Sequence, residues 1–265
     1  MGIATELENA VHDMTVDYVG GVSAQFCAAL VPIAVTAITI YLLWTGWLIA
    51  RGGSPDSWNT ALMRVVRIAF VVALALVAGT YQTVVADTIA AIGVAFVETL
   101  AGVATVGELL DANMDPFATL CREVFNQAIT GVIPNVALVL AAVLIGLSGA
   151  LMLIVGLGLV ILSKLALALL LAVGPAFLLC AMFPATQRFT ESWLAQALQF
   201  VFVNVLVVAL ITMLTDFAAA YVAAVAEDPE AVNVLMASMS LAIAVGATLV
   251  VFFNLNTIAS ALTGG

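Results

Sequence analysis

The most apolar part of the chain lies between Glu123 and Arg188, where 64 residues contain a single charged side chain, Lys164. Leu, Val, Ile, Ala and Gly fill this stretch, and no helical face within it is polar enough to be turned toward water. A bilayer core about 30 Å thick takes about 20 helical residues. The pattern therefore predicts membrane-embedded helix, and more of it than one ordinary crossing requires.

Other apolar runs of helix length lie on both sides of this stretch. They cover about residues 30–50, 68–85, 193–214 and 232–253. Each run is continuously apolar, whereas the strands of a membrane barrel alternate apolar and polar residues with a period of two. The sequence therefore predicts an all-α, polytopic transmembrane protein with five or six spans.

Two further segments are apolar on one helical face only. In residues 1–29 the polar positions Asn9, Asp13 and Asp17 lie opposite an apolar stripe formed by Ile3, Leu7, Val11, Met14, Tyr18, Val22 and Phe26. We expect an external amphipathic helix that lies along the membrane surface or packs against a partner. The charged residues of 86–131 are mainly acidic, and the segment predicts a large external loop with an interfacial helix, whose apolar stripe is Ile89, Ile92, Phe96, Leu100, Val103 and Leu110.

Positively charged residues cluster around one short connection. Arg51 and Gly52 begin it, and Arg64 and Arg67 lie in the first turns of the helix that follows. The positive-inside rule makes such a loop cytoplasmic, which leaves the N-terminus outside. Residues 30–85 are therefore predicted to form two spans joined by a cytoplasmic basic loop.

Residues 132–255 form the predicted C-terminal transmembrane region, and residues 256–265 form a short tail. If the chain crosses twice before Arg188, with a turn near Lys164, the protein has six spans, and Arg188 and the tail lie outside. If it crosses once, the protein has five spans, and both are cytoplasmic. The five-span threading also leaves outside the acidic loop that holds Asp216, Glu227, Asp228 and Glu230, which is weak support because acids contribute little to orientation.

Composition narrows the class of protein. Hydrophobic residues make up 65% of the chain and the mean hydropathy is +1.25, which is typical of a membrane protein. Sixteen acids against six Lys and Arg give a net charge of −10. This balance argues against a protein that itself grips nucleic acid, because such proteins need Lys and Arg to neutralise phosphates. The acidic N-terminal segment is also unlike a secretory signal peptide, which begins with basic residues.

Candidate chemistry is sparse. Cys27, Cys121 and Cys180 show no metal-binding spacing, although a disulfide between Cys27 and Cys121 stays open. His12 has no partner in sequence. No nucleotide loop and no nucleophile with a base is evident, so we expect neither enzymatic activity nor a cofactor.

Five residues are therefore singled out by their place in the chain. Lys164 and Arg188 lie at the two ends of a helix that Gly174 and Pro175 are expected to kink, although the kink alone has no functional meaning in many spans. Lys164 contacts a substrate or partner, or extends toward the lipid headgroups. Trp193 contacts substrate, or anchors the chain at the membrane interface.

Several motifs, taken in order, resemble the TrbL/VirB-six family of type IV secretion systems. In the first part of the chain they are Tyr41-Leu-Leu-Trp-Thr-Gly46-Trp47-Leu-Ile-Ala-Arg51-Gly52, Arg64-Val-Val-Arg67-Ile-Ala and Tyr81. In the second part they are Lys164-Leu-Ala-Leu-Ala-Leu-Leu-Leu-Ala-Val-Gly174-Pro175, Phe183-Pro184-Ala-Thr186-Gln-Arg188-Phe189 with Trp193, and the final Ala259-Ser-Ala-Leu-Thr-Gly264-Gly265. The resemblance covers most of the chain. Its specificity comes from the order of all these motifs together and not from any single motif.

The resemblance implies a subunit of the bacterial inner-membrane complex that moves DNA or protein substrates and supports assembly of the conjugative pilus. It also implies an external N-terminus, a large central periplasmic loop, about five spans and a cytoplasmic C-terminus. The implied partners are other inner-membrane and periplasmic secretion subunits, secretion ATPases, pilus subunits, lipid and further copies of the chain in a homo-oligomer. Translocated DNA or protein would be bound only transiently.

Two other classes of protein stay open. A small-solute transporter or channel usually carries ionisable residues at mid-membrane and two related halves with broken helices. Here Lys164 is the one ionisable residue in the predicted membrane cores, and no convincing internal repeat is evident. The third class is a membrane assembly factor that forms no conduit.

Overall fold

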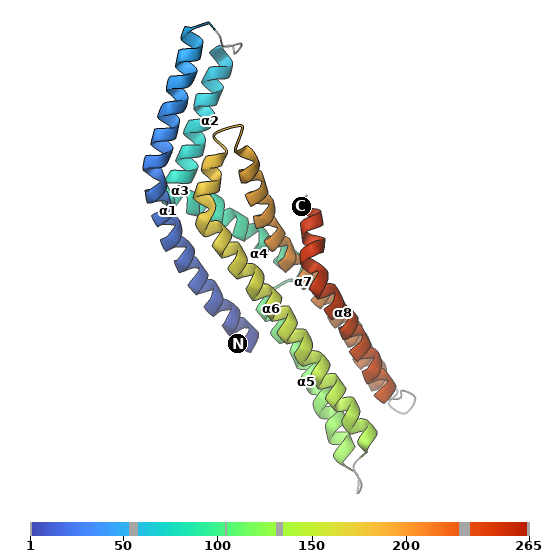
Figure 1. Cartoon of the computed structure of the whole chain (residues 1–265). Helices are drawn as coiled ribbons and strands as arrows, with labels where there is room; N and C mark the ends of the chain where they lie inside the picture. Colours follow the sequence, from blue (N-terminus) through green and yellow to red (C-terminus); the bar gives the residue numbers. More distant parts are fainter. Residues whose placement is uncertain (1, 53–57, 104, 131–134, 228–233, 264–265) are drawn as a thin grey trace. The chain divides into compact units, whose positions relative to one another are not determined.

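The computed structural model is helical in nearly all of the residues it describes, which are 2–52, 58–103, 105–130, 135–227 and 234–263. The elements, in chain order, are α1 (Ile3–Ala50), α2 (Trp58–Leu76), α3 (Ala78–Thr80), the π-helix η1 (Tyr81–Ala86), α4 (Asp87–Ala101), α5 (Val106–Ile129), α6 (Val136–Cys180), α7 (Gln187–Glu227) and α8 (Val234–Leu262). Figure 1 labels the α-helices. The predicted all-α fold is confirmed.

Among the described residues, five helical segments are long and apolar enough to cross a membrane. They are Ile3–Ala50, Tyr81–Ile129, Val136–Cys180, Gln187–Phe217 and Val234–Leu262. Four of them contain runs that the sequence predicted as spans. The remaining segment, Tyr81–Ile129, contains α4 and α5 and overlaps only the end of the predicted second span. Most of that predicted span lies in α2 and η1.

The chain divides into two compact units. Unit 1 comprises Met1–His12, Ile92–Lys164 and Gln199–Gly264, and unit 2 comprises Asp13–Ala91 and Leu165–Leu198. Several long helices therefore contribute one part to each unit.

In unit 1, α5 and the first part of α6 form an antiparallel hairpin with close contacts at glycines. A Cβ added at Gly146 would lie 3.3 Å from Cys121 Sγ, and one at Gly149 would lie 3.1 Å from Phe117 Cβ. From Gly146 to Gly149 the position on α6 advances, while the contacting residue on α5 moves back from Cys121 to Phe117. This order is expected for antiparallel helices (Figure 1). Small residues on α6 thus let the two helices approach closely at these positions. The exposed Gly158 is different, because no described atom lies within 4 Å of a Cβ placed there.

The core of unit 1 continues from this hairpin onto α7 and α8. Gly156 lets the side chains of Leu110 and Ile211 approach within 3.5 Å of an added Cβ, and Phe252 of α8 lies just beyond. Ile211 and Phe252 are almost completely buried. These contacts join four helices around one apolar core.

In unit 2, the second half of α1 and α2 lie side by side as a hairpin (Figure 1). Its small core contains Ala34 from α1, Ile68 and Ala75 from α2, and Leu179 and Met182 from the end of α6 and the turn after it. Cys27 belongs to the same unit, and its thiol donates to the Ala75 carbonyl oxygen at 3.2 Å. Cys27, Cys121 and Cys180 are all free thiols, so the Cys27–Cys121 disulfide is not formed.

The helix α6 is unbroken from Val136 to Cys180. Its 45 residues correspond to roughly 68 Å at 1.5 Å per residue, which is about twice the thickness of a bilayer core. The six-span threading requires a turn near Lys164, and the described helix has none. The structure therefore favours the five-span threading.

The helix α1 is likewise continuous from Ile3 through Pro32 to Ala50, so the predicted surface segment and first span are one helix. The apolar stripe predicted for its first half is largely exposed, for example at Ile3, Met14 and Tyr18. The residues that are buried instead are small or polar: Ala4, Thr5, Glu8, Ser23 and Cys27. The apolar stripe is therefore available to lipid, and these small and polar residues make the contacts within the protein, whereas Asp13 and Asp17 are exposed.

Candidate functional site

A carbonyl oxygen without a helical partner lies in the last third of α6. Pro175 has no backbone N–H, so the oxygen of Leu171, four residues earlier, loses its usual donor. The Tyr81 hydroxyl donates to this oxygen at 2.5 Å, and Tyr81 is completely buried. Tyr81 is the first residue of the π-helix η1, a distortion often found at functional positions. A side chain from elsewhere in unit 2 thus completes the hydrogen bonding of α6.

Trp193 on α7 binds the same part of α6. Its indole Nε1 donates to the Leu170 carbonyl oxygen at 3.0 Å, and its ring stacks on Phe177 with centroids 6.5 Å apart and planes 10° from parallel. Only 4% of Trp193 is exposed. The side chain that the sequence suggested as an interface anchor or a substrate contact is therefore buried, with its N–H paired inside unit 2.

Gly174 allows these two aromatic residues to approach α6. A Cβ added at Gly174 would overlap the Tyr81 hydroxyl and would lie 2.8 Å from Trp193 Cζ2. Both contacts are closer than real side chains make, so any larger residue must displace one ring or the other. The structure thus brings together Gly174, Pro175 and Trp193 from the sequence-based set, and adds Tyr81. We call these four residues, with Leu171, the proline-break site.

The basic residues of unit 2 lie around two turns. Gly52 ends α1 with a φ of 68°, a conformation that glycine adopts easily, and the Arg51 guanidinium lies 4.1 Å from the centre of the Trp47 ring. Arg67 Nη2 donates to Gln187 Oε1 at 2.8 Å. Arg188, the next residue, is exposed.

An aromatic contact joins the turn between α6 and α7 to α1. The ring of Tyr41 on α1 meets the ring of Phe183 edge to face, with the centroids 5.3 Å apart. Together with the Arg67–Gln187 bond, it places the turn between α6 and α7 beside the α1–α2 hairpin, at Tyr41 and Arg67. We call this part of unit 2 the basic end; its arginines are Arg51, Arg64, Arg67 and Arg188.

Lys164 lies in unit 1 and is paired. Its ammonium group contacts the Glu8 carboxylate, whose side chain is only 2% exposed, against 26% for Lys164. The neighbouring Ser163 hydroxyl donates to Asn204 Oδ1 at 2.6 Å. Sequence reasoning missed Glu8 because it belongs to a segment that carries several other acids. The one available signal was that a lysine in an apolar helix needs a counter-charge.

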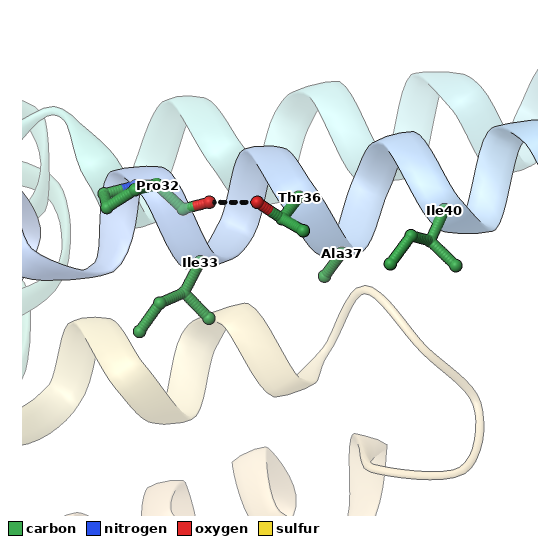
Figure 2. A pocket seen from close by; sticks show the side chains of 5 residues that line it. All are labelled: Pro32, Ile33, Thr36, Ala37 and Ile40. Carbon is green, nitrogen blue, oxygen red and sulfur yellow. Dashed lines mark hydrogen bonds between the residues drawn. The ribbon is translucent and has the colours of Figure 1, made fainter.

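A shallow groove on α1 offers little for substrate chemistry. It has a volume of about 470 Å³ and is lined by Pro32, Ile33, Thr36, Ala37 and Ile40. Figure 2 shows that the Thr36 hydroxyl is directed back to the Pro32 carbonyl oxygen, at 2.8 Å. The remaining lining is apolar, so this surface suits a lipid chain or a neighbouring helix.

The long apolar helices and the hydrogen bonds completed between them define a polytopic α-helical membrane protein. The family model described as "TrbL/VirB6 plasmid conjugal transfer protein" matches residues 38–255, and the chain belongs to this family. The resemblance inferred from the motifs is confirmed. Together with the five long apolar helices among the described residues, this match identifies the chain as a multi-pass inner-membrane protein and a type IV secretion system subunit.

Curated relatives carry matching names. The chain is similar to type IV secretion system protein VirB6 of Bartonella quintana, with 28% identity over 225 residues that cover 80% of this chain and 63% of that protein. It is 31% identical to type IV secretion system protein PtlD of Bordetella pertussis over 173 residues, which cover 62% of this chain and 37% of PtlD. The chain thus spans less than two thirds of the length of these relatives.

Proposed function

We propose that this chain is a scaffold or conduit subunit that supports passage of DNA or protein substrates across the inner membrane and assembly of a pilus. The observation that carries the proposal is the family match over residues 38–255, which includes the proline-break site and the basic end. Energy for transport comes from partner ATPases. Further partners are other inner-membrane and periplasmic secretion subunits, pilus subunits and additional copies of this chain in a homo-oligomer.

We further propose that the basic end is cytoplasmic. The positive-inside rule places connections rich in Arg and Lys in the cytoplasm. Because Arg67 and Gln187 are hydrogen-bonded, we expect both turns of the basic end on the same side of the membrane. The N-terminus and the end of α5 are then periplasmic. Since α7 and α8 cross once each, the C-terminus is cytoplasmic.

The functional proposal is tested in cells whose own copy of the gene is deleted. The full chain should restore transfer of a mobilisable plasmid or secretion of a protein substrate, and it should co-purify with secretion ATPases and pilus proteins. Uptake of a small solute by the purified protein alone in liposomes, without restored transfer, would instead identify a transporter.

The orientation is tested by labelling single cysteines in a background without Cys27, Cys121 and Cys180. A membrane-impermeant maleimide added to intact spheroplasts should label Thr130→Cys. It should label Ala185→Cys and Thr263→Cys only after the membrane is opened. Labelling of both Thr130→Cys and Ala185→Cys in intact spheroplasts would indicate the six-span threading, and labelling of Ala185→Cys without Thr130→Cys would reverse the proposed orientation.

A further inference from the structure

Glu8 is a buried carboxylate held by two donors in unit 1. Only 1% of the residue is exposed. One oxygen contacts the Lys164 ammonium group, and the other accepts the backbone N–H of Gly107. Gly107 is the second residue of α5, so its N–H is one of those left unpaired at a helix N-terminus. An ammonium group beside a helix N-terminus is a favourable site for an anion.

A second carboxylate makes the converse contact. Asp111 on α5 accepts the N–H groups of Ala4 and Thr5, in the first turn of α1, at 3.1 and 2.9 Å. It also accepts the Thr5 hydroxyl at 2.6 Å. Each helix thus supplies a carboxylate that caps the first turn of the other.

Gly107 makes this close approach possible. A Cβ added there would lie 2.7 Å from Glu8 Oε2, 2.8 Å from Thr5 Cα and 2.9 Å from the Ala4 carbonyl oxygen. Two of these three atoms belong to the backbone of α1 and cannot rotate away. The first turns of α1 are therefore seated directly on the N-terminus of α5.

We propose that Lys164 and the N-terminus of α5 form a carboxylate-binding site whose ligand is Glu8 of the same chain, and that this site docks the first turns of α1. Lys164 acts through Glu8 and does not contact the transported substrate. The proposal follows from the buried position of Glu8, because a carboxylate withdrawn from water needs a counter-charge and paired oxygens. This docking of α1 onto α5 does not depend on which substrate the protein transports.

The energetic consequence is asymmetric. Removing the charge of Lys164 leaves the Glu8 carboxylate buried without a counter-charge, which is a severe change. Removing the charge of Glu8 leaves Lys164, which is partly exposed and can reach water. Removing both charges leaves a glutamine oxygen that still accepts the Gly107 N–H. The double variant should therefore be more stable than the single Lys164 variant.

The test uses the purified full-length protein in detergent and compares K164M, E8Q and E8Q/K164M by their apparent midpoints of thermal unfolding. K164M should lower the midpoint by roughly 5–10 °C, and E8Q by less. The double variant should recover at least half of the loss. Glu6→Gln, an exposed acid on the same helix, is the matched control and should leave the midpoint unchanged.

A double variant that is as unstable as K164M, or a K164M midpoint equal to that of the wild type, would overturn the proposal. If K164M yields no folded protein, a folded E8Q/K164M supports the site and an unfolded one contradicts it. A plasmid-transfer measurement, which rests on the proposed function, adds a separate comparison. A stable double variant that fails to support transfer while E8Q supports it would assign Lys164 a direct role in transport.

Discussion

The Tyr81 hydroxyl donates a hydrogen bond to the carbonyl oxygen of Leu171, the same oxygen that Pro175 leaves without a helical partner. An unpaired carbonyl in an apolar interior is costly, because neither water nor the helix can supply a donor. The proline and the tyrosine, 94 positions apart in the chain, therefore form one structural pair. The hydrogen bond holds the start of η1 against α6 at Leu171.

Tyr81→Phe should destabilise the protein by about 1–3 kcal/mol, because it leaves the Leu171 oxygen buried and unpaired. The effect should shrink by more than half in a Pro175→Ala background, where the alanine N–H supplies the missing donor. The measurement is the apparent free energy of unfolding of the two single variants and the double variant, taken as a double-mutant cycle.

Tyr18→Phe is the matched control for this cycle. Tyr18 is 51% exposed, so loss of its hydroxyl should change stability by less than about 0.5 kcal/mol. Equal costs of Tyr81→Phe with and without Pro175 would show that the proline is irrelevant to the bond.

Gly174→Ala should be destabilising by about 1–3 kcal/mol, because the new methyl group overlaps the Tyr81 hydroxyl and crowds the Trp193 ring. Gly158→Ala, on the same helix, should be neutral or slightly stabilising, since no described atom lies within 4 Å of the new methyl group and alanine is the better helix former. Thermal unfolding in detergent distinguishes the two. A Gly158 variant as unstable as the Gly174 variant would point to backbone effects and not to the aromatic contacts.

Much of the fold could be predicted from the sequence, because a bilayer demands long apolar helices and little else. The packing face of α6 could not, since both of its faces are apolar. Its exposed residues in unit 1 include a set that recurs every three or four positions: Val136, Leu140, Val143, Leu147, Leu151, Ile154, Gly158 and Leu162. Glycines alone do not mark the packed side, since Gly146, Gly149 and Gly156 contact other helices and Gly158 is exposed.

The candidate residues were identified only in part. Pro175 indicated a break, but the donor that pairs with Leu171 could not be named, because any hydroxyl in the chain could supply it. Glu8 was hidden for the opposite reason: its segment is acidic, and no local pattern distinguishes a buried acid from an exposed one.

Asp111→Ala should free the N–H groups of Ala4 and Thr5 and destabilise the docking of α1 by about 0.5–2 kcal/mol, the usual cost of losing a helix cap. Hydrogen exchange of the full-length protein in detergent should show faster exchange at these two amides. Asp115→Ala is the matched control, because Asp115 lies one turn later on α5 and is exposed. Unchanged exchange in the Asp111 variant would show that the cap does not hold α1.

The position of Gln187, at the start of α7, beside Arg67 of α2 can be tested by cross-linking. In a background without the native cysteines, Arg67→Cys and Gln187→Cys should be joined within one chain by a short bis-maleimide in native membranes, because the parent side chains meet at 2.8 Å. Val66→Cys with Gln187→Cys is the control, since Val66 is exposed and the adjacent residue points to another side of the helix. The six-span threading puts residues 67 and 187 on opposite sides of the membrane. Failure of the Arg67 pair to cross-link above the control would therefore restore that threading and remove the proposed cytoplasmic side of the C-terminus.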